Sequence, residues 1–176
     1  MYTSIARRLA IVGLILAMMP VATVQPASAE QLGQLAGEAV LTVTGDIQVT
    51  NVDDTAKFDL EMLRSMDSTV IKTSTIWTEG EQTFTGVSLD VLAKRLGISD
   101  GMFRATAIND YTVEIPVSDA VAGGPIIAYE VNGSTMSVRD KGPLWIVYPY
   151  DADSKYRSEV VYGRSIWQLD RLEVVK

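Results

Sequence analysis

Residues 84–97 have the sequence FTGVSLDVLAKRLG, and this stretch carries the clearest helix signal in the chain. Its apolar residues recur at the spacing of one helix face: Leu89, Leu92, Ala93 and Leu96. Ser88 stands where an N-terminal cap belongs, and Gly97 stands where a C-terminal cap belongs. The stretch therefore predicts a helix over 89–96 that packs its apolar face in the core.

Short strands are expected on both sides of this helix. The β-branched run 70–77 precedes it, and 102–108 and 112–115 follow it as two strands joined through 109–111. Further strands are expected over 40–44, 47–50, 126–131, 144–148 and 169–175. The first two of these read as a hairpin closed by a turn at Gly45–Asp46.

Few helices accompany these strands. Asp59 can cap a short helix over 60–66, and residues 118–121 allow at most one helical turn. Many short strands with a few short helices indicate an α+β fold with mixed β-sheets. No repeat divides the chain, so a single domain is predicted over 39–176 after a flexible leader at 30–38.

The composition excludes several classes of chemistry. The 176 residues include no Cys and no His, which rules out disulfides, Ser-His-Asp triads and zinc sites built from His or Cys. Acidic residues number 22 against 15 Lys and Arg, for a formal net charge of −7. Such a surface repels phosphate backbones and anionic lipids, so we expect no nucleic-acid partner and no membrane binding beyond the signal peptide.

Residues 1–29 have the pattern of a signal peptide. Arg7 and Arg8 form a positive region, 9–21 is apolar, and 27–29 reads Ala-Ser-Ala, a small-residue cleavage site. We expect cleavage before Glu30 and export to the periplasm. A retained anchor is the competing interpretation, although the apolar run is shorter than the roughly 18–20 residues that span a bilayer. The paired arginines leave both the Sec and the twin-arginine route open.

Five segments in order carry a family resemblance: 84–89 with Leu92 and Leu96–Gly97, then AINDYTVEIP (107–116), IAYEVNG (127–133), KGPLWIVYP (141–149) and RSIWQLDRLEV (164–174). Together they resemble the molybdopterin-binding domain of the sulfite oxidase family. The resemblance implies that family's α+β fold of mixed sheets with short helices. It also implies a cofactor whose molybdenum is held by the pterin dithiolene and by one cysteine at the end of the strand before Gly86.

The chain departs from the family at that cofactor. The matching strand offers only the hydroxyls of Thr73, Ser74 and Thr75. The family's phosphate-binding lysine aligns with Trp167 and its arginine with Trp145. A phosphate-bearing cofactor needs compensating positive charge, so we expect no ordinary cofactor, with molybdopterin implied by the resemblance alone. By alignment Trp77 and Trp167 flank the cofactor region, either as core residues or as side chains that fill the pterin's space.

Two clusters are candidates for ligand binding. The corner Asn109-Asp110-Tyr111 either binds a ligand beside the cleft or forms an Asx turn with Tyr111 packed on the sheet. The second cluster gathers aromatic and charged groups, and it forms either a functional loop or a solvated one: Tyr148, Pro149, Tyr150, Asp151, Lys155, Tyr156, Arg157 and Arg164. Ser165 is a further position that could line a pocket. The Asp-Ala-Asp at 151–153 lacks the glycine and glutamate of a calcium loop, so no metal ligands are predicted.

Three functions remain open at this point. The first is an exported module without ordinary molybdenum catalysis that binds a small ligand or an exported protein partner. The alternative is a small periplasmic molybdopterin-dependent oxidoreductase with Thr73, Ser74 or Thr75 near the metal and a partner for electron exchange. The third is a purely structural subunit of a larger complex.

Overall fold

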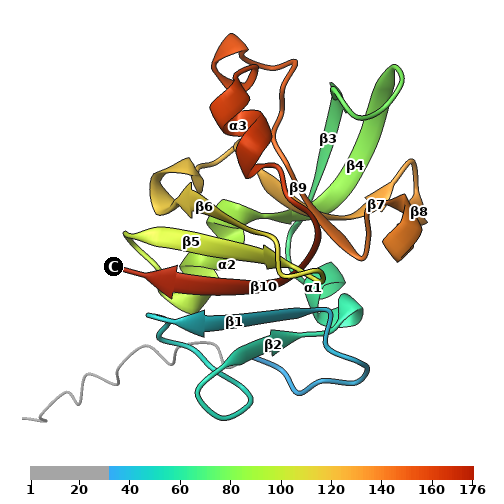
Figure 1. Ribbon diagram of the computed structural model, residues 1–176. Coiled ribbons are helices and arrows are strands. Elements are labelled where there is room, and N and C mark those ends of the chain that lie inside the picture. The colour runs from blue at the N-terminus through green and yellow to red at the C-terminus, as the bar shows by residue number, and fades with distance from the viewer. Residues whose placement is uncertain (1–31) are drawn as a thin grey trace, which may run out of the picture.

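The computed structural model describes residues 32–176, which form one ten-stranded mixed β-sheet with short helices around it (Figure 1). The strands are β1 (Leu41–Gly45), β2 (Ala56–Phe58), β3 (Ser68–Ser74), β4 (Glu81–Ser88), β5 (Met102–Ala107), β6 (Thr112–Pro116), β7 (Ile126–Val131), β8 (Ser134–Thr135), β9 (Leu144–Val147) and β10 (Trp167–Val175). The α-helices are α1 (Leu60–Ser65), α2 (Leu89–Leu96) and α3 (Glu159–Arg164). Single 3-10 turns occur at η1 (Val117–Asp119), η2 (Val138–Asp140) and η3 (Ser154–Tyr156). The predicted α+β class is confirmed.

Strand β10 joins the two halves of the sheet. The main strand order is β2-β1-β10-β9-β7-β4-β3, with β5 and β6 branching from β10 and β8 from β7. The start of β10 pairs with β9 through Trp167 and Leu169, whereas its later residues pair in parallel with β1 and antiparallel with β5. In Figure 1 the β3–β4 hairpin therefore rises on one side of β10, and β1 and β2 lie on the other.

The hydrophobic core contains the apolar helix face that the sequence predicted. The apolar face of α2 is buried as predicted: Leu89, Leu92, Ala93 and Leu96. Gly97 ends this helix in the left-handed conformation, with its N–H donating to carbonyls of the last turn. Ser88 precedes the helix in extended conformation, but its side chain makes no capping bond. Asp59 does cap α1, because its carboxylate accepts from the Met62 N–H at 2.8 Å.

The predicted hairpin over 40–50 is wrong. Strand β1 pairs with β2 on one edge and with β10 on the other, so neither edge is free for 47–50. Those residues turn away instead, and the Gln48 N–H donates to the Leu96 carbonyl at the end of α2. The three-residue β2 and the helix α3 lie in segments for which no strand or helix was predicted.

Two predicted boundaries also change. The strand expected over 70–77 ends at Ser74, because Thr75 starts a turn in which its Oγ1 accepts from the Trp77 N–H at 3.0 Å. Part of the predicted leader is held in place, since the N–H groups of Ala36 and Gly37 donate to the Asp59 carboxylate at 2.7 and 2.9 Å.

The predicted signal peptide at 1–29 lies outside the described residues, and so does the start of the leader. Within residues 32–176, no helix has both the length and the apolar character needed to cross a bilayer.

Candidate functional site

An aromatic pocket of about 320 Å³ opens where the turn after β3, the β5–β6 corner, α3 and the start of β10 meet. Its lining includes five residues predicted as site candidates: Trp77, Asn109, Tyr111, Ser165 and Trp167. It also includes five that were not predicted: Ala107, Tyr162, Gly163, Ile166 and Gln168. The pocket thus unites residues of the first predicted cluster, the further candidate Ser165 and the two tryptophans aligned with the family's cofactor region.

Trp77 lies at the centre of the aromatic side chains around this pocket. Its ring centroid is 5.6 Å from that of Trp167 and 5.9 Å from those of Trp145 and Tyr162. These contacts are edge-to-face, with interplanar angles of 65° to 87°. Edge-to-face pairs of this kind are favourable beyond their buried area. Trp145 is buried, whereas Trp167 remains 36% exposed, so the cluster is core on one side and open on the other.

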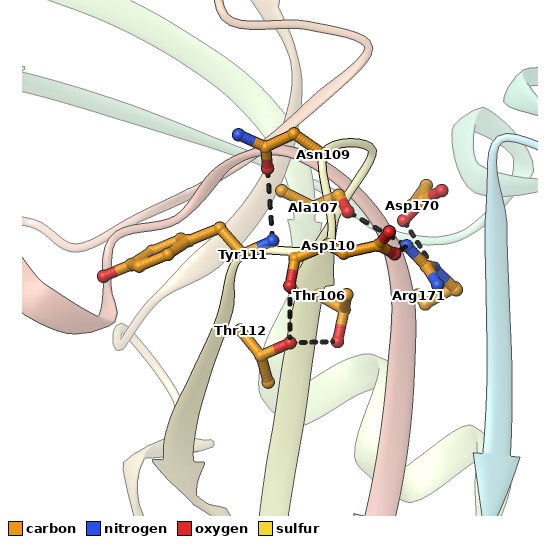
Figure 2. Close-up of polar contacts among 8 residues, drawn as sticks. All are labelled: Thr106, Ala107, Asn109, Asp110, Tyr111, Thr112, Asp170 and Arg171. Atoms are coloured by element: carbon orange, nitrogen blue, oxygen red, sulfur yellow. Dashed lines mark hydrogen bonds and ion pairs between the residues drawn. The ribbon is translucent and has the colours of Figure 1, made fainter.

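The β5–β6 corner directs its side chains to opposite sides of the hairpin (Figure 2). Asn109 Oδ1 accepts from the Tyr111 N–H at 3.2 Å, which is the Asx turn. Asp110 has a positive φ of 66° and accepts from Arg171 at 2.8 Å on the side away from the Tyr111 ring. Tyr111 does not pack on the sheet; it is 58% exposed and lines the pocket.

Arg171 fixes this corner from the neighbouring strand. Its guanidinium donates to the Ala107 carbonyl at 3.0 Å as well as to Asp110 and Asp170 (Figure 2). Hydrogen bonds to the two carboxylates raise the pKa of Arg171 above its usual value. Asp110 is therefore occupied in positioning the corner and does not reach the pocket.

A bulge at Gln168 shapes the pocket's other wall. The pairing register of β10 with β9 shifts between Trp167 and Leu169, across this residue, which has a positive φ of 56°. Its N–H donates to the Lys141 carbonyl, its carbonyl accepts from the Ile108 N–H, and its side chain donates to the Val138 carbonyl. The bulge thereby ties three segments together next to the exposed Trp167.

The three hydroxyl residues aligned with the family's cysteine do not line the pocket. Thr73 is fully buried, and its Oγ1 accepts from the Asp151 N–H at 3.1 Å. Ser74 donates to the Asp151 carboxylate through its N–H at 2.6 Å and through its hydroxyl, and these bonds lower the pKa of Asp151. Thr75 shares a hydrogen bond of 2.7 Å with Thr78. All three hydroxyls serve local structure.

The second predicted cluster divides into two hydrogen-bond networks, one around the buried Tyr150 and one around the buried Tyr148. Tyr150 donates to Ser165 Oγ at 2.6 Å, and Ser165 donates onward to the Val161 carbonyl at 2.8 Å. Burial raises the pKa of Tyr150 to about 12. Arg157 donates through Nε to the Tyr150 carbonyl at 2.9 Å. Only Ser165 of these residues reaches the aromatic pocket.

The other network centres on Asp119, which the sequence did not single out. Its carboxylate accepts from the Tyr148 hydroxyl at 2.7 Å and from Arg164 at 2.9 Å. Burial, followed by the hydrogen bond to Asp119, raises the pKa of Tyr148 well above its usual value. Tyr148 and Arg164 border a separate cavity of about 330 Å³, on which Lys155 and Tyr156 also lie.

The side chains that line the aromatic pocket carry no formal charge. Of the residues that line it, none is Asp, Glu, Lys or Arg. Within residues 32–176 no group of three or more acidic side chains is placed to hold a metal ion.

Comparison with known families finds a match over most of the chain. The sequence profile of the family described as "Oxidoreductase molybdopterin binding domain" matches residues 41–155, about two thirds of the chain. The matched range ends before α3 and β10, which together with Ser165 and Ile166 supply six of the ten residues that line the pocket. No curated protein matches the chain.

Proposed function

The chain belongs to the oxidoreductase molybdopterin-binding domain family, and we propose that this member is a binding module that takes a small, non-anionic organic ligand in its aromatic pocket. One observation carries the proposal: the pocket is lined by aromatic rings and neutral polar groups, with no charged side chain among its lining residues. Small-molecule sites are concave, mostly apolar and furnished with a few polar groups, and begin at about 300 Å³.

The same lining does not fit the family's cofactor. Molybdopterin carries a phosphate, and an anion in an aromatic pocket without a cation loses its hydration and gains no charged partner. The chain has no cysteine to ligate the metal. The hydroxyls at that position are committed to Asp151 and to the turn at 75–78, so no free oxygen ligand replaces the thiolate.

The alternative function is that of a small molybdopterin-dependent oxidoreductase with a Thr or Ser environment at the metal. Family membership favours it, because the family's description names that cofactor. Metal analysis and a visible absorption spectrum of protein purified from its own host separate the two functions. The binding module predicts no molybdenum above background. About one equivalent of molybdenum per chain would refute the binding module and establish the oxidoreductase.

Export belongs to the proposal as well. The signal-peptide pattern at 1–29 supports a periplasmic location, and an exported protein is then the natural partner of a small binding module. N-terminal sequencing of the protein from a periplasmic fraction tests this step. A chain that begins near Glu30 supports export with cleavage, and a chain that begins at Met1 contradicts it.

A further inference from the structure

We infer that the aromatic pocket selects a quaternary ammonium group, such as the trimethylammonium head of a choline-like compound. This inference names the ligand class of the site and rests on the proposed binding function. Four aromatic rings line the pocket, and they come from four separate segments of the chain: Trp77, Tyr111, Tyr162 and Trp167.

The relative orientation of the rings favours a round group over a flat one. The Trp77 ring meets the rings of Tyr162 and Trp167 at 87° and 75°, with centroids 5.9 and 5.6 Å apart. A planar ligand is held best between parallel rings, because stacking needs two faces that oppose each other. Rings that meet at steep angles instead form the corner of a box. A compact, nearly spherical head can touch several faces of such a box at once.

The charge distribution favours a cation that has no N–H groups. Aromatic faces carry the negative part of the ring quadrupole, so they attract cations and disfavour anions. A primary ammonium, with three N–H groups, is held best by a carboxylate, which the lining lacks; its acceptors are neutral oxygens, and Ser165 Oγ already bonds to Tyr150 and Val161. A quaternary ammonium has no N–H groups to satisfy, and its weak hydration makes desolvation less costly.

The cationic side chains near this region leave the four pocket rings to a ligand. Lys141 lies over the Trp145 ring, which does not line the pocket, with Nζ 5.7 Å from the ring centroid. Arg171 binds Asp110 and Asp170 beside the hairpin corner, and Arg164 binds Asp119 on the side of the separate cavity. The whole chain carries a net charge of −7, which raises the local concentration of a cationic ligand. Ring geometry, a neutral lining and an acidic surface therefore all agree on the same class of ligand.

Matched probes test this class. Choline chloride and its uncharged isostere 3,3-dimethyl-1-butanol have the same shape at the head and differ in charge. Their dissociation constants are measured from tryptophan fluorescence and by calorimetry at constant ionic strength, with sodium chloride as the salt control. We expect choline to bind at least tenfold more tightly, which corresponds to about 1.4 kcal/mol.

Substitutions at Tyr111 locate the binding. This residue is exposed, so its replacement leaves the core intact. Tyr111→Phe keeps the ring and should retain choline affinity within about threefold, whereas Tyr111→Leu should weaken it by about tenfold. Tyr156→Leu makes the same change beside the separate cavity and should have no effect. Urea unfolding midpoints confirm that each variant is folded.

The outcomes separate this inference from the proposed function. If the isostere binds as tightly as choline, the pocket is a ligand site but not a cation cage, and only this inference fails. Absence of choline binding, or equal binding by Tyr111→Leu, also overturns the inference. Molybdenum at one equivalent per chain would overturn the proposed function itself, whatever the probes show.

Discussion

Ser165→Ala should destabilise the protein more than Tyr150→Phe, although both substitutions remove the same hydrogen bond. The Tyr150 hydroxyl donates to Ser165 Oγ at 2.6 Å, and both residues are only 2% exposed. In Tyr150→Phe the Ser165 hydroxyl keeps its bond to the Val161 carbonyl, so the loss is that of one ordinary bond, about 1 kcal/mol. In Ser165→Ala the phenol is left buried without an acceptor, which costs about 1–3 kcal/mol.

The double variant makes this reasoning testable. With both groups removed no phenol is left unsatisfied, so Tyr150→Phe with Ser165→Ala should cost less than the sum of the single changes by about 1 kcal/mol. Urea denaturation followed by tryptophan fluorescence gives the three free energies of unfolding. Tyr162→Phe is the matched control, because the Tyr162 hydroxyl makes no hydrogen bond within the described residues and its removal should change stability little. Additive single changes, or a Tyr150→Phe loss larger than that of Ser165→Ala, would refute the proposed bond.

Three further predictions concern pH, backbone packing and the hairpin corner. The unfolded chain loses the Tyr150 proton near pH 10, whereas the folded protein keeps it to about pH 12, so stability should fall as pH rises through this window, with about 3 kcal/mol of the fall due to Tyr150. The raised pKa of Tyr148 adds a fall of its own, so the test is that alkaline urea titrations show a smaller fall for Tyr150→Phe than for the unchanged protein. Gly86→Ala should lower the melting temperature by the equivalent of about 1–3 kcal/mol, because its Cβ would lie 2.2 Å from a backbone oxygen of β7. Gly163→Ala in α3 meets nothing within 4 Å and should raise the melting temperature slightly; a rise for Gly86→Ala or a fall for Gly163→Ala would contradict the corresponding prediction. Arg171→Gln should weaken choline binding several-fold, because it releases the hairpin corner that carries Tyr111. It should lower the free energy of unfolding by less than about 1 kcal/mol, since the ion pairs of Arg171 are exposed. Unchanged choline affinity would show that the corner keeps its position without these ion pairs.

Local signals predicted the parts of the fold that depend on local physics. The helix 89–96 follows from its apolar spacing and from Gly97, and the β5–β6 pair follows from two short strand-like runs around the turn at 109–111. The false hairpin at 40–50 shows where such signals stop. Leu41–Gly45 has the alternation of a strand, but its partners are set by long-range pairing with β10, more than 120 residues away. The local sequence contains no signal that β1 pairs with β2 on one edge and with β10 on the other.

The residues that line the pocket were also predicted only where a local signal marks them. Trp77, Asn109 and Tyr111 stand out by residue type and by their position beside predicted elements. Gln168 does not, because a left-handed glutamine is stabilised here by hydrogen bonds to segments distant in the sequence. Tyr162 was missed together with α3, although Ser158 gave a usable signal: its side chain accepts from the Val161 N–H as a helix N-cap.

The hydroxyls at the family's cysteine position explain why the pocket keeps its shape without a metal-ligating residue there. Thr73 and Ser74 bind the backbone N–H and the carboxylate of Asp151, so they join the end of β3 to the loop that follows β9. Thr75 in turn holds the Trp77 N–H and so sets the start of the turn that carries the central ring of the pocket. A thiol placed at residue 73 would be fully buried against Asp151 and would leave the pocket's neutral lining unchanged. Under the proposed function, a variant designed to hold the family's cofactor would need new positive charges in α3 and β10 as well as a metal ligand in β3, because the anion and the metal make separate demands on the site.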